Sequence, residues 1–377
     1  MANAPSVNTW NQTVFSTVNT CALAALATVS FASAQSSVTF YGVLDAGFSD
    51  TENKSSFGNS SASGIGSGGM STSRWGIRGT EDLGGGLAAT FNLESEVNVG
   101  NGAVGGSQDL GLFNRRAVVG LKGNFGTVNL GRDNNPLYDV IGTGDVFGMT
   151  GIITTGLLPI GQRVNNMVSY ETPVFGGFSA KAMVAQDKSQ SATLGAPELS
   201  SRTSAISAKY ANGPLVVTAG WGERKGDAGL DGGTINKARV ATGSNNAKQD
   251  GTAIAATYDF GVAKLFSNYV QAEMSNGIVN QRLKAKEVNV GVSVPLGAFT
   301  LMAAYGHNDV DANYAATGAS NINGKGDDYV LGATYTMSKR TDLYVKTGTY
   351  NKISGNFAGT AADFKTTGTV FGLRHSF

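Results

Sequence analysis

The sequence has no run of 18 or more apolar residues after its N-terminal segment, so helical membrane spans are excluded. Charged residues make up only 15% of the 377 residues, whereas soluble globular domains carry roughly 25%. The formal net charge is +1, so no charge excess indicates a nucleic-acid partner. A chain with few charges and no helical spans is compatible with a membrane β-barrel, because each strand of such a barrel is apolar on one face only.

Cysteine is nearly absent, and the one that exists, Cys21, lies in an N-terminal segment of unusual composition. Residues 1–44 contain no Lys, Arg, Asp or Glu, and the apolar stretch from Cys21 ends in Ala32-Ser33-Ala34, which has the pattern of a cleavage site. We therefore predict a signal peptide over residues 1–34, although it lacks the usual basic start, and a mature chain of residues 35–377. The alternative is a polar tail followed by a core helix. The mature chain would have no disulfide and no thiol chemistry.

The end of the chain shows the most informative pattern that is present. Phe371, Leu373, His375 and Phe377 alternate with small or charged residues. A period of two is typical of a strand with two unlike faces. Soluble chains more often end in polar, frayed residues, so an aromatic terminal residue on such a strand favours an outer-membrane β-barrel.

The same alternation recurs along the mature chain. Each run has roughly the 9–11 residues that a tilted strand needs to cross a bilayer. The clearest runs are Ser37–Phe48, Thr72–Asp82, Leu87–Val99, Thr252–Phe260, Ala298–His307 and Asp328–Met337.

Two kinds of connection alternate between these runs. Seven are short and mostly marked by glycine or proline, as at Leu83-Gly84-Gly85-Gly86 and Asn212-Gly213-Pro214; glycine supplies the positive φ that hairpin turns need. Eight are long and polar, such as 51–71, 226–249 and 309–325. These counts predict an all-β fold, a transmembrane 16-stranded antiparallel up-and-down barrel, closed because hydrocarbon offers no partner to an open strand edge. A soluble propeller or β-helix is the alternative, but the sequence has no regular blade repeat.

Sixteen strands would enclose water rather than a packed interior, and one loop stands out as a means of narrowing it. The segment 133–162 contains no lysine or arginine and is more apolar than the other long loops. Long loops in compact domains are usually functional. We interpret it as the third external loop, folded inward to form a constriction; a surface lid or a trimer contact is the alternative.

Charged residues of both signs occupy the channel-facing positions that we expect to lie near this loop. Arg near the middle of the lipid face would cost roughly 2–4 kcal/mol, so these side chains should face water. We expect arginines on one wall and carboxylates opposite, and we expect that strand alternation lets only one of Arg115 and Arg116 face the lumen. Since arginines predominate, the sequence predicts anion preference. The basic candidates are Arg74, Arg78, Arg115, Arg116 and Arg163, and the acidic ones are Glu94, Glu96, Asp139 and Asp145.

The sequence lacks the residues that other functions would require. A hydrolase would need a Ser-His or Asp-His arrangement, but only His307 and His375 exist, and we expect both to be interfacial or loop residues. No Cys/His cluster suggests a metal, and no Gly-Lys-Ser/Thr follows the glycines of 83–87. We therefore expect no enzyme activity and no cofactor. A solute-specific channel, with aromatic residues such as Tyr41, Tyr138 and Phe147 in the pore, and a surface adhesin remain alternatives.

Several motifs resemble the general diffusion porins of Gram-negative outer membranes, in their β-proteobacterial branch. They are Ser37-Val38-Thr39-Phe40-Tyr41-Gly42, the run from Ser73-Arg74-Trp75-Gly76 to Leu87, Leu130-Gly131-Arg132-Asp133, Ser169-Tyr170-Glu171-Thr172-Pro173, Ser338-Lys339-Arg340-Thr341 and Gly372-Leu373-Arg374-His375-Ser376-Phe377.

The resemblance implies a homotrimer in the outer membrane, in contact with its lipid and lipopolysaccharide, that passes small ions and solutes and binds no nucleic acid. By this resemblance Arg74, Arg115 and Arg163 match the basic cluster of the constriction, and Glu94 matches an acidic residue facing it. The terminal Phe377 matches the signal read by the barrel-assembly machinery. The constriction loop departs from the family pattern, because it is rich in glycine and isoleucine and has few charges.

Overall fold

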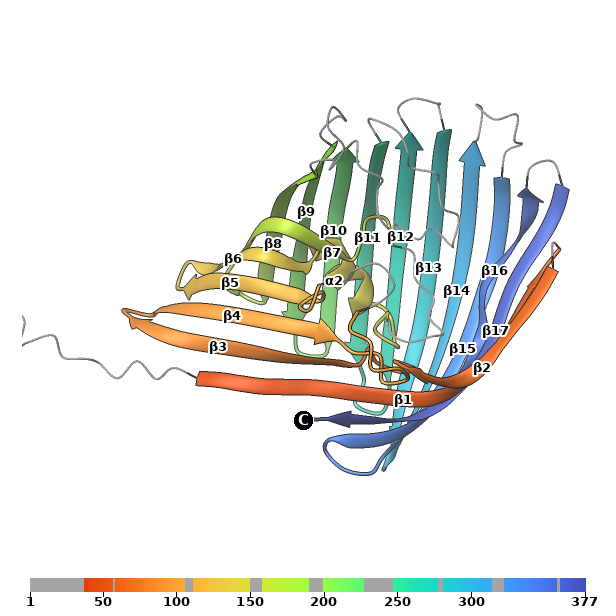
Figure 1. Ribbon diagram of the computed structural model, residues 1–377, viewed down its shortest axis with the longest axis horizontal. Coiled ribbons are helices and arrows are strands. Elements are labelled where there is room, and N and C mark those ends of the chain that lie inside the picture. Colours follow the sequence, from red (N-terminus) through yellow and green to blue (C-terminus); the bar gives the residue numbers. More distant parts are fainter. Residues whose placement is uncertain are drawn as a thin grey trace, which may run out of the picture.

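The computed structural model describes residues 37–56, 58–105, 111–149, 158–189, 199–226, 247–276, 281–313, 322–357 and 360–377. These residues form one antiparallel sheet of 17 strands and a short helix, α2 (Pro136–Thr143) (Figure 1). The predicted signal peptide lies outside the described residues. The strands are β1 (Ser37–Ser55), β2 (Gly58–Ser67), β3 (Arg74–Gly84), β4 (Leu87–Glu96), β5 (Arg116–Gly123), β6 (Gly126–Asn134), β7 (Arg163–Glu171), β8 (Phe178–Ser189), β9 (Leu199–Asn212), β10 (Leu215–Gly226), β11 (Ala247–Asp259), β12 (Lys264–Asn276), β13 (Gln281–Leu296), β14 (Phe299–Asn313), β15 (Ile322–Thr336), β16 (Thr341–Phe357) and β17 (Thr360–Ser376).

The sheet closes through β1, which pairs with β17 along one edge. Along its other edge β1 pairs first with β3, where Val43 faces Arg74, and then with β2, where Ala46 faces Ser67. Strands β2 and β3 thus pair with different lengths of the same edge of β1 and together fill one strand position of the barrel. The 17 strands therefore make a closed 16-strand barrel. The predicted architecture is confirmed. The expected loop at 51–71 is wrong for most of its length, because β1 and β2 continue there as a hairpin.

The C-terminal residue takes part in this closure. The backbone N–H of Phe377 donates to the carbonyl of Gly42 at 3.1 Å, and the N–H of Gly42 donates back to Phe377 at 3.1 Å. The rings of Phe40 and Phe377 stack with centroids 5.5 Å apart. The terminal aromatic therefore covers the seam between the first and last strands, at the end of the barrel where the short turns lie.

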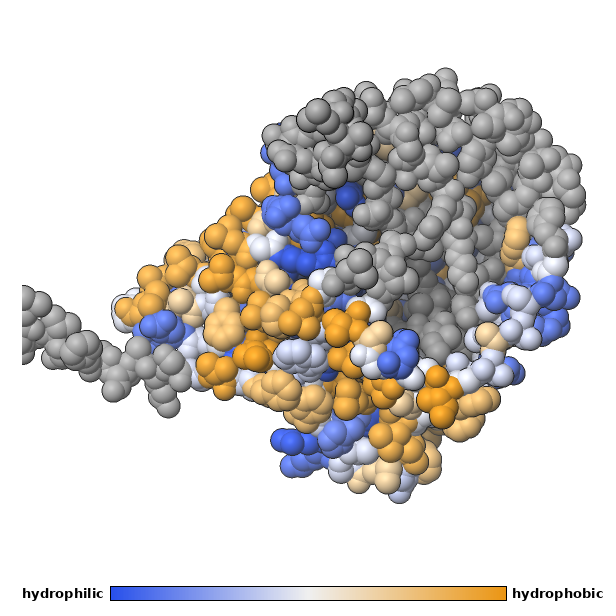
Figure 2. All heavy atoms as spheres, in the orientation of Figure 1, coloured by the Kyte–Doolittle hydropathy of each residue, from blue (hydrophilic) through white to orange (hydrophobic). Residues whose placement is uncertain are grey.

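Alternation gives the strands their two faces. In β1, Phe40 points outward and is 59% exposed, whereas Asp45 points inward and is fully buried. Apolar side chains gather on the outer surface over β3–β6 (Figure 2). Among the described residues, no helix combines the length and apolar content that a membrane span requires.

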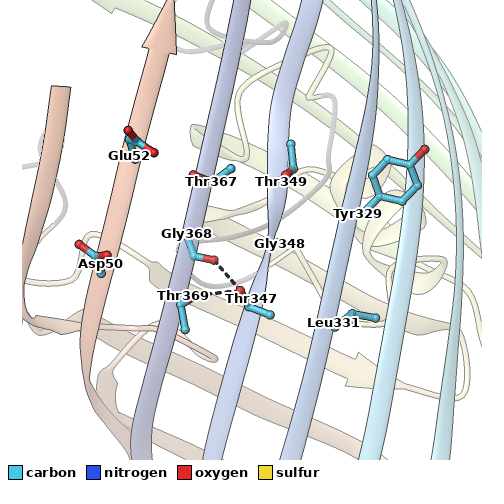
Figure 3. A pocket seen from close by; sticks show the side chains of 10 residues that line it. All are labelled: Asp50, Glu52, Tyr329, Leu331, Thr347, Gly348, Thr349, Thr367, Gly368 and Thr369. Atoms are coloured by element: carbon cyan, nitrogen blue, oxygen red, sulfur yellow. Dashed lines mark hydrogen bonds between the residues drawn. The ribbon is translucent and has the colours of Figure 1, made fainter. Parts of the chain in front are cut away.

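On β1 and β15–β17, away from the short-turn end of the barrel, outward side chains carry hydroxyl and carboxylate groups as well as apolar ones. A shallow depression of about 440 Å³ lies on the outer face of β1 and β15–β17, and its side chains point away from the lumen (Figure 3). Within it the Thr347 hydroxyl bonds to the Thr369 hydroxyl at 2.7 Å and donates to the Gly368 carbonyl at 3.1 Å. Asp50 and Glu52 stand beside these threonines. Such groups fit a wet boundary rather than hydrocarbon, because lipid would leave them unsatisfied.

Candidate functional site

The loop after β6 folds into the barrel, and its two ends are held together. The Asn135 backbone N–H donates to the Gln162 carbonyl at 2.9 Å, and the Asn135 side-chain amide donates to the Gly161 carbonyl at 2.5 Å. The Asn135 Oδ1 also accepts the N–H of Tyr138 at 2.8 Å and so caps α2. Pro136 occupies the first turn, where a missing N–H costs nothing. Asn135 thus holds the two ends of the loop together and caps the start of α2.

Helix α2 packs against the inner face of β8–β12 (Figure 1). Leu137 and Ile141 are fully buried there. The helix approaches closely because the wall is built from small residues: a side chain at Gly220 would lie 3.0 Å from Val140. The Asn268 amide of β12 donates to the Ile141 carbonyl at 3.1 Å, and this carbonyl also accepts the N–H of Gly144, so the end of the helix is bonded to the wall.

Beyond the helix, the loop continues along the wall to β16. A side chain at Gly291 of β13 would lie 3.0 Å from Val146, and the ring of Phe147 lies 5.2 Å from Nζ of Lys346, which is fully buried. Phe147 also packs in an apolar cluster with Val330. The inward fold of the third loop is therefore confirmed for its described residues. Residues 150–157 of this loop lie outside the described residues.

These contacts correct one expectation about the strands. The inner faces of β8–β13 are largely apolar where the loop covers them, with buried residues such as Met183, Ala205 and Ala253, although buried polar residues such as Asn268 lie among them. The expectation that each strand is apolar on one face only is wrong for this part of the barrel, because the loop supplies a second dry interface.

The part of the inner wall that the described loop residues leave uncovered carries the predicted charges. Glu94 of β4 accepts from Arg115, with Nε and Oε1 2.7 Å apart, and lies 3.6 Å from Nε of Arg74. A terminal nitrogen of Arg115, Nη1, is 3.7 Å from Glu96. Four of the predicted residues thus form one network across β3, β4 and the start of β5.

This geometry corrects the expected arrangement of charge. Glu94 and Glu96 stand between the arginines on the same wall, so the interpretation of an acidic wall facing a basic one is wrong for them. Asp139 lies on α2 but pairs with Lys181 at 3.2 Å. Asp145 is 5% exposed, and its carboxylate accepts the N–H groups of Phe147 and Met149 at 2.8 Å. Asp145 therefore shapes the loop tip.

Both arginines of the pair at the start of β5 reach the lumen. Arg116 forms two bonds of 2.8 Å to Asp133, while Arg115 binds Glu94 from just outside the strand. The expectation that only one faces inward is wrong, because β5 begins at Arg116 and strand alternation does not apply to the residue before it. Arg132 lies nearby, and its Nε donates to the Asn114 carbonyl at 2.6 Å.

Arg78 extends the basic row down β3. Its guanidinium lies 5.0 Å from the ring centroid of Tyr41. The Tyr41 hydroxyl lies 2.9 Å from Asn92 and 3.1 Å from Glu94. Tyr41 therefore connects Arg78 with the Arg74–Glu94–Arg115 network.

Arg163 and Tyr138 join this wall to the loop. Arg163 begins β7, and its Nη1 lies 3.4 Å from Oε1 of Gln162. Burial raises the pKa of the Tyr138 hydroxyl, while the nearby positive charges of Arg163 and Arg115 act to lower it. Because burial dominates, the hydroxyl stays neutral at physiological pH, and the loop adds no negative charge here.

Sequence reasoning missed several residues of the site. Asp133 was predicted only as the start of the loop, and Lys181 and Lys346 were not predicted as lumen residues. Their strands alternate regularly, so the inward position could have been found, but their partners Asp139 and Phe147 come from the loop and are not signalled by spacing.

The described residues contain no group of three or more His, Cys, Asp and Glu side chains that could hold a metal. His307 lies in β14 and is bonded to Asp327 at 2.8 Å, and His375 is bonded to Thr341 at 2.9 Å. Neither lies in the charged network of the inner wall.

Comparison with known proteins gives a consistent result. The Gram-negative porin family profile matches residues 21–353. The outer membrane porin protein 32 of Delftia acidovorans is 35% identical over 94% of this chain and 98% of its own length. A porin of Bordetella pertussis is 32% identical over 92% of this chain and 96% of its own. Among solved structures, the anion-selective porin from Comamonas acidovorans aligns with a TM-score of 0.71 and 30% identity, covering 91% of this chain and 100% of that one. The trimer form of OmpT from Vibrio cholerae, at 17% identity and TM-score 0.63, covers 91% of this chain and 99% of its own and shares the fold.

Proposed function

Because this chain belongs to the Gram-negative porin family, whose members are outer-membrane channels and not enzymes, we propose that its lumen passes small hydrophilic solutes by diffusion and favours anions. The observation that carries the preference is the charge count around the Arg74–Glu94–Arg115 network. Five arginines (Arg74, Arg78, Arg115, Arg116 and Arg163) stand there against three carboxylates (Glu94, Glu96 and Asp133).

The proposed selectivity arises from this excess. At a separation of about 8 Å and an effective dielectric constant near 20, one unpaired charge is worth roughly 2 kcal/mol to a passing ion. Salt screens the interaction over about 10 Å at 0.1 M, so the preference weakens as ionic strength rises. The solved relative from Comamonas acidovorans is an anion-selective porin, and this likeness supports the same sign.

The test is the zero-current potential of the purified protein in a planar bilayer across a potassium chloride gradient. We expect the sign that corresponds to chloride permeating faster than potassium, and a smaller potential when both salt concentrations are raised at a constant ratio. A potential of the opposite sign would contradict the proposal.

We also propose that the chain assembles as a homotrimer, in contact with outer-membrane lipid and lipopolysaccharide. The trimer form of the related OmpT fold supports this assembly. An apolar groove of about 550 Å³ on the outer face of β1, β2, β16 and β17, which includes Phe48, Ile65 and Phe371, offers a surface that either a neighbouring barrel or lipid would cover. Native mass spectrometry in mild detergent should give three times the mass of the mature chain.

Phe377 is proposed to act in assembly, as the residue that the barrel-assembly machinery reads. Its ring and both of its backbone bonds at the seam of the barrel support a role in closure as well. Deleting Phe377 should lower the amount of folded protein in outer-membrane fractions severalfold. If deletion left membrane levels unchanged while the isolated protein still refolded in detergent, the assembly role would be contradicted.

A further inference from the structure

The connection between β2 and β3, residues 68–73, is held against the inner side of the wall by one carboxylate. Asp45 of β1 is fully buried. Its Oδ2 accepts the backbone N–H of Met70 at 2.9 Å and that of Ser71 at 2.6 Å. Its backbone carbonyl accepts the N–H of Gly68 at 2.9 Å. A single residue of β1 thus binds the 68–73 segment at three points.

A tyrosine from a strand that does not pair with β1 binds the second oxygen of this carboxylate. The Tyr344 hydroxyl of β16 donates to Oδ1 of Asp45 at 2.5 Å, although β17 lies between β16 and β1. The ring can cross because two glycines lie beneath it: a side chain at Gly372 would lie 2.5 Å from the hydroxyl, and one at Gly47 would lie 2.8 Å from it. Both oxygens of the buried carboxylate therefore have donors, which a buried charge needs.

The 68–73 segment connects the third loop with the charged network. Met70 is 7% exposed and belongs to the same apolar cluster as Phe147 of the loop tip. Near the other end of the segment, the carbonyl of Thr72 accepts from Nη1 of Arg74 at 3.0 Å. The segment that Asp45 holds therefore contacts both the cluster that contains the loop tip and an arginine of the network.

Asp45 and Asp145 organise their surroundings in the same way. Each is a buried carboxylate that accepts two nearby backbone N–H groups, Asp45 in the 68–73 segment and Asp145 at the loop tip. The charges of both carboxylates act on the ammonium group of Lys346, which is fully buried and lies 5.2 Å from the Phe147 ring. The two carboxylates and the lysine thus place the 68–73 segment and the loop tip in one buried, charge-balanced unit.

We infer that Asp45 is a positioning residue of the pore: by holding the 68–73 segment, it keeps the tip of the third loop and Arg74 in place relative to each other. Tyr344 assists it by binding the second carboxylate oxygen. Release of the segment would let the loop tip leave the wall and obstruct the lumen for short periods. The inference goes beyond the proposed anion preference, which depends on the number of charges and not on what holds the loop.

The first test is single-channel recording of the purified protein in a planar bilayer at one voltage. Asp45→Asn keeps the size of the side chain but replaces charge-assisted bonds to the segment with neutral ones, so brief closures should become about tenfold more frequent. Tyr344→Phe keeps the ring and every charge and removes only the hydroxyl bond, so closures should become about threefold more frequent.

Tyr305→Phe is the matched control. The Tyr305 hydroxyl also donates to an aspartate, Asp327, at 2.8 Å, but this pair lies on the outer positions of β14 and β15 and takes no part in the 68–73 segment. Closures in Tyr305→Phe should be as frequent as in the natural protein.

A second measurement separates positioning from stability. Met70→Cys places a thiol in the segment, and its reaction with a charged thiol reagent can be followed by peptide mass spectrometry, apart from Cys21, the one natural cysteine. Well below the unfolding temperature, labelling should be slow in Met70→Cys alone and about threefold faster when Tyr344→Phe is added.

Tyr344→Phe decides the outcome if Asp45→Asn does not fold. Equal closure frequencies in Tyr344→Phe and Tyr305→Phe, or unchanged labelling of Met70→Cys on addition of Tyr344→Phe, would overturn the inference. A lower unfolding temperature without either change would show that Asp45 and Tyr344 only stabilise the barrel.

Discussion

The two halves of the inner wall use opposite chemistry although the same kind of strand builds them. On β3–β6 the inward positions carry Arg74, Arg78, Glu94 and Arg116. On β8–β13 they carry many small or apolar residues that the loop covers, such as Gly220 and Ala253, with buried polar residues such as Asn268 among them. The difference shows that the described part of the third loop packs against the portion of the inner wall that is rich in small and apolar residues and leaves the arginine-rich portion uncovered.

The half of the inner wall that the loop covers depends on a close approach between the loop and the strands. A side chain at Gly222 would lie 2.6 Å from the end of Ile160, and one at Gly251 would overlap Pro159. Small residues at these positions let the loop lie flat against the wall, so that the remaining lumen stays wide. Overfilling such a contact costs typically about 1–3 kcal/mol.

The largest expected effect comes from removing that close approach. Gly251→Val should push Pro159 off the wall and move the returning arm of the loop into the lumen. We expect single-channel conductance to fall by about half, with unfolding at a lower temperature, consistent with an overpacking cost of about 1–3 kcal/mol. Single-channel recording and thermal unfolding followed by circular dichroism would measure both.

Gly64→Val is the matched control for this change. Gly64 is also a strand glycine, and a side chain there would meet nothing within 4 Å. Its conductance and unfolding temperature should stay at the natural values. If Gly251→Val behaved like Gly64→Val, the loop would not be held by contact with small residues.

The second prediction concerns the charged half. Arg74→Ser combined with Arg163→Ser removes two of five arginines and leaves Glu94 paired with Arg115 alone. The chloride-to-potassium permeability ratio should fall about threefold, less than two unscreened charges would give because salt weakens the field. Zero-current potentials give the ratio, and an unchanged ratio would remove these residues from the selectivity filter.

A smaller effect is expected where the loop tip meets the far wall. Lys346→Met removes the fully buried cation beside Phe147 while keeping most of the side-chain volume. Cation–π contacts are worth about 0.5–2 kcal/mol, so the loop tip should loosen and the channel should show more frequent brief closures at the same voltage.

Lys264→Met provides the comparison, since Lys264 also lies over a ring, at 5.1 Å, but this ring is that of Phe266 in strand β12 and not of a loop residue. Current noise should change only for Lys346→Met. Equal noise in both variants would show that the buried lysine does not hold the loop.

The smallest effect is a pH dependence. Burial raises the pKa of the Tyr138 hydroxyl above the value of 10.0 for an exposed side chain. The stability that this contributes is complete below pH 10 and is lost as pH rises through the raised value. Thermal stability should therefore fall above pH 10 more in the natural protein than in Tyr138→Phe, and selectivity between pH 6 and 9 should be the same in both. A selectivity difference in that range would contradict a neutral Tyr138.

Much of the fold could be predicted from local patterns in the sequence. The alternation of Phe371, Leu373 and Phe377, the glycine turns and the alternation of short and long connections were enough to predict the barrel and its strand count. The 51–71 segment was misjudged because its Gly/Ser-rich sequence has loop composition; its pairing with β1 depends on a hairpin that composition does not signal.

The sequence predicted which residues belong to the candidate site better than it predicted how they are arranged. All five arginines were named from their place in or beside the predicted strands, yet Glu94 and Glu96 were expected across the pore. Which wall a residue faces across a closed barrel depends on curvature and on the loop, neither of which appears in a strand pattern.

The sequence by itself determined that this chain forms a closed barrel with a wet interior, because a period of two separates the two faces of every strand wherever the chain folds. Only the tertiary structure decided which part of that interior stays wet. The loop between β6 and β7 meets β8–β16 through contacts between residues far apart in the chain, such as Asn268 with Ile141 and Lys346 with Phe147. Such contacts depend on closure of the whole barrel, so no local pattern encodes them.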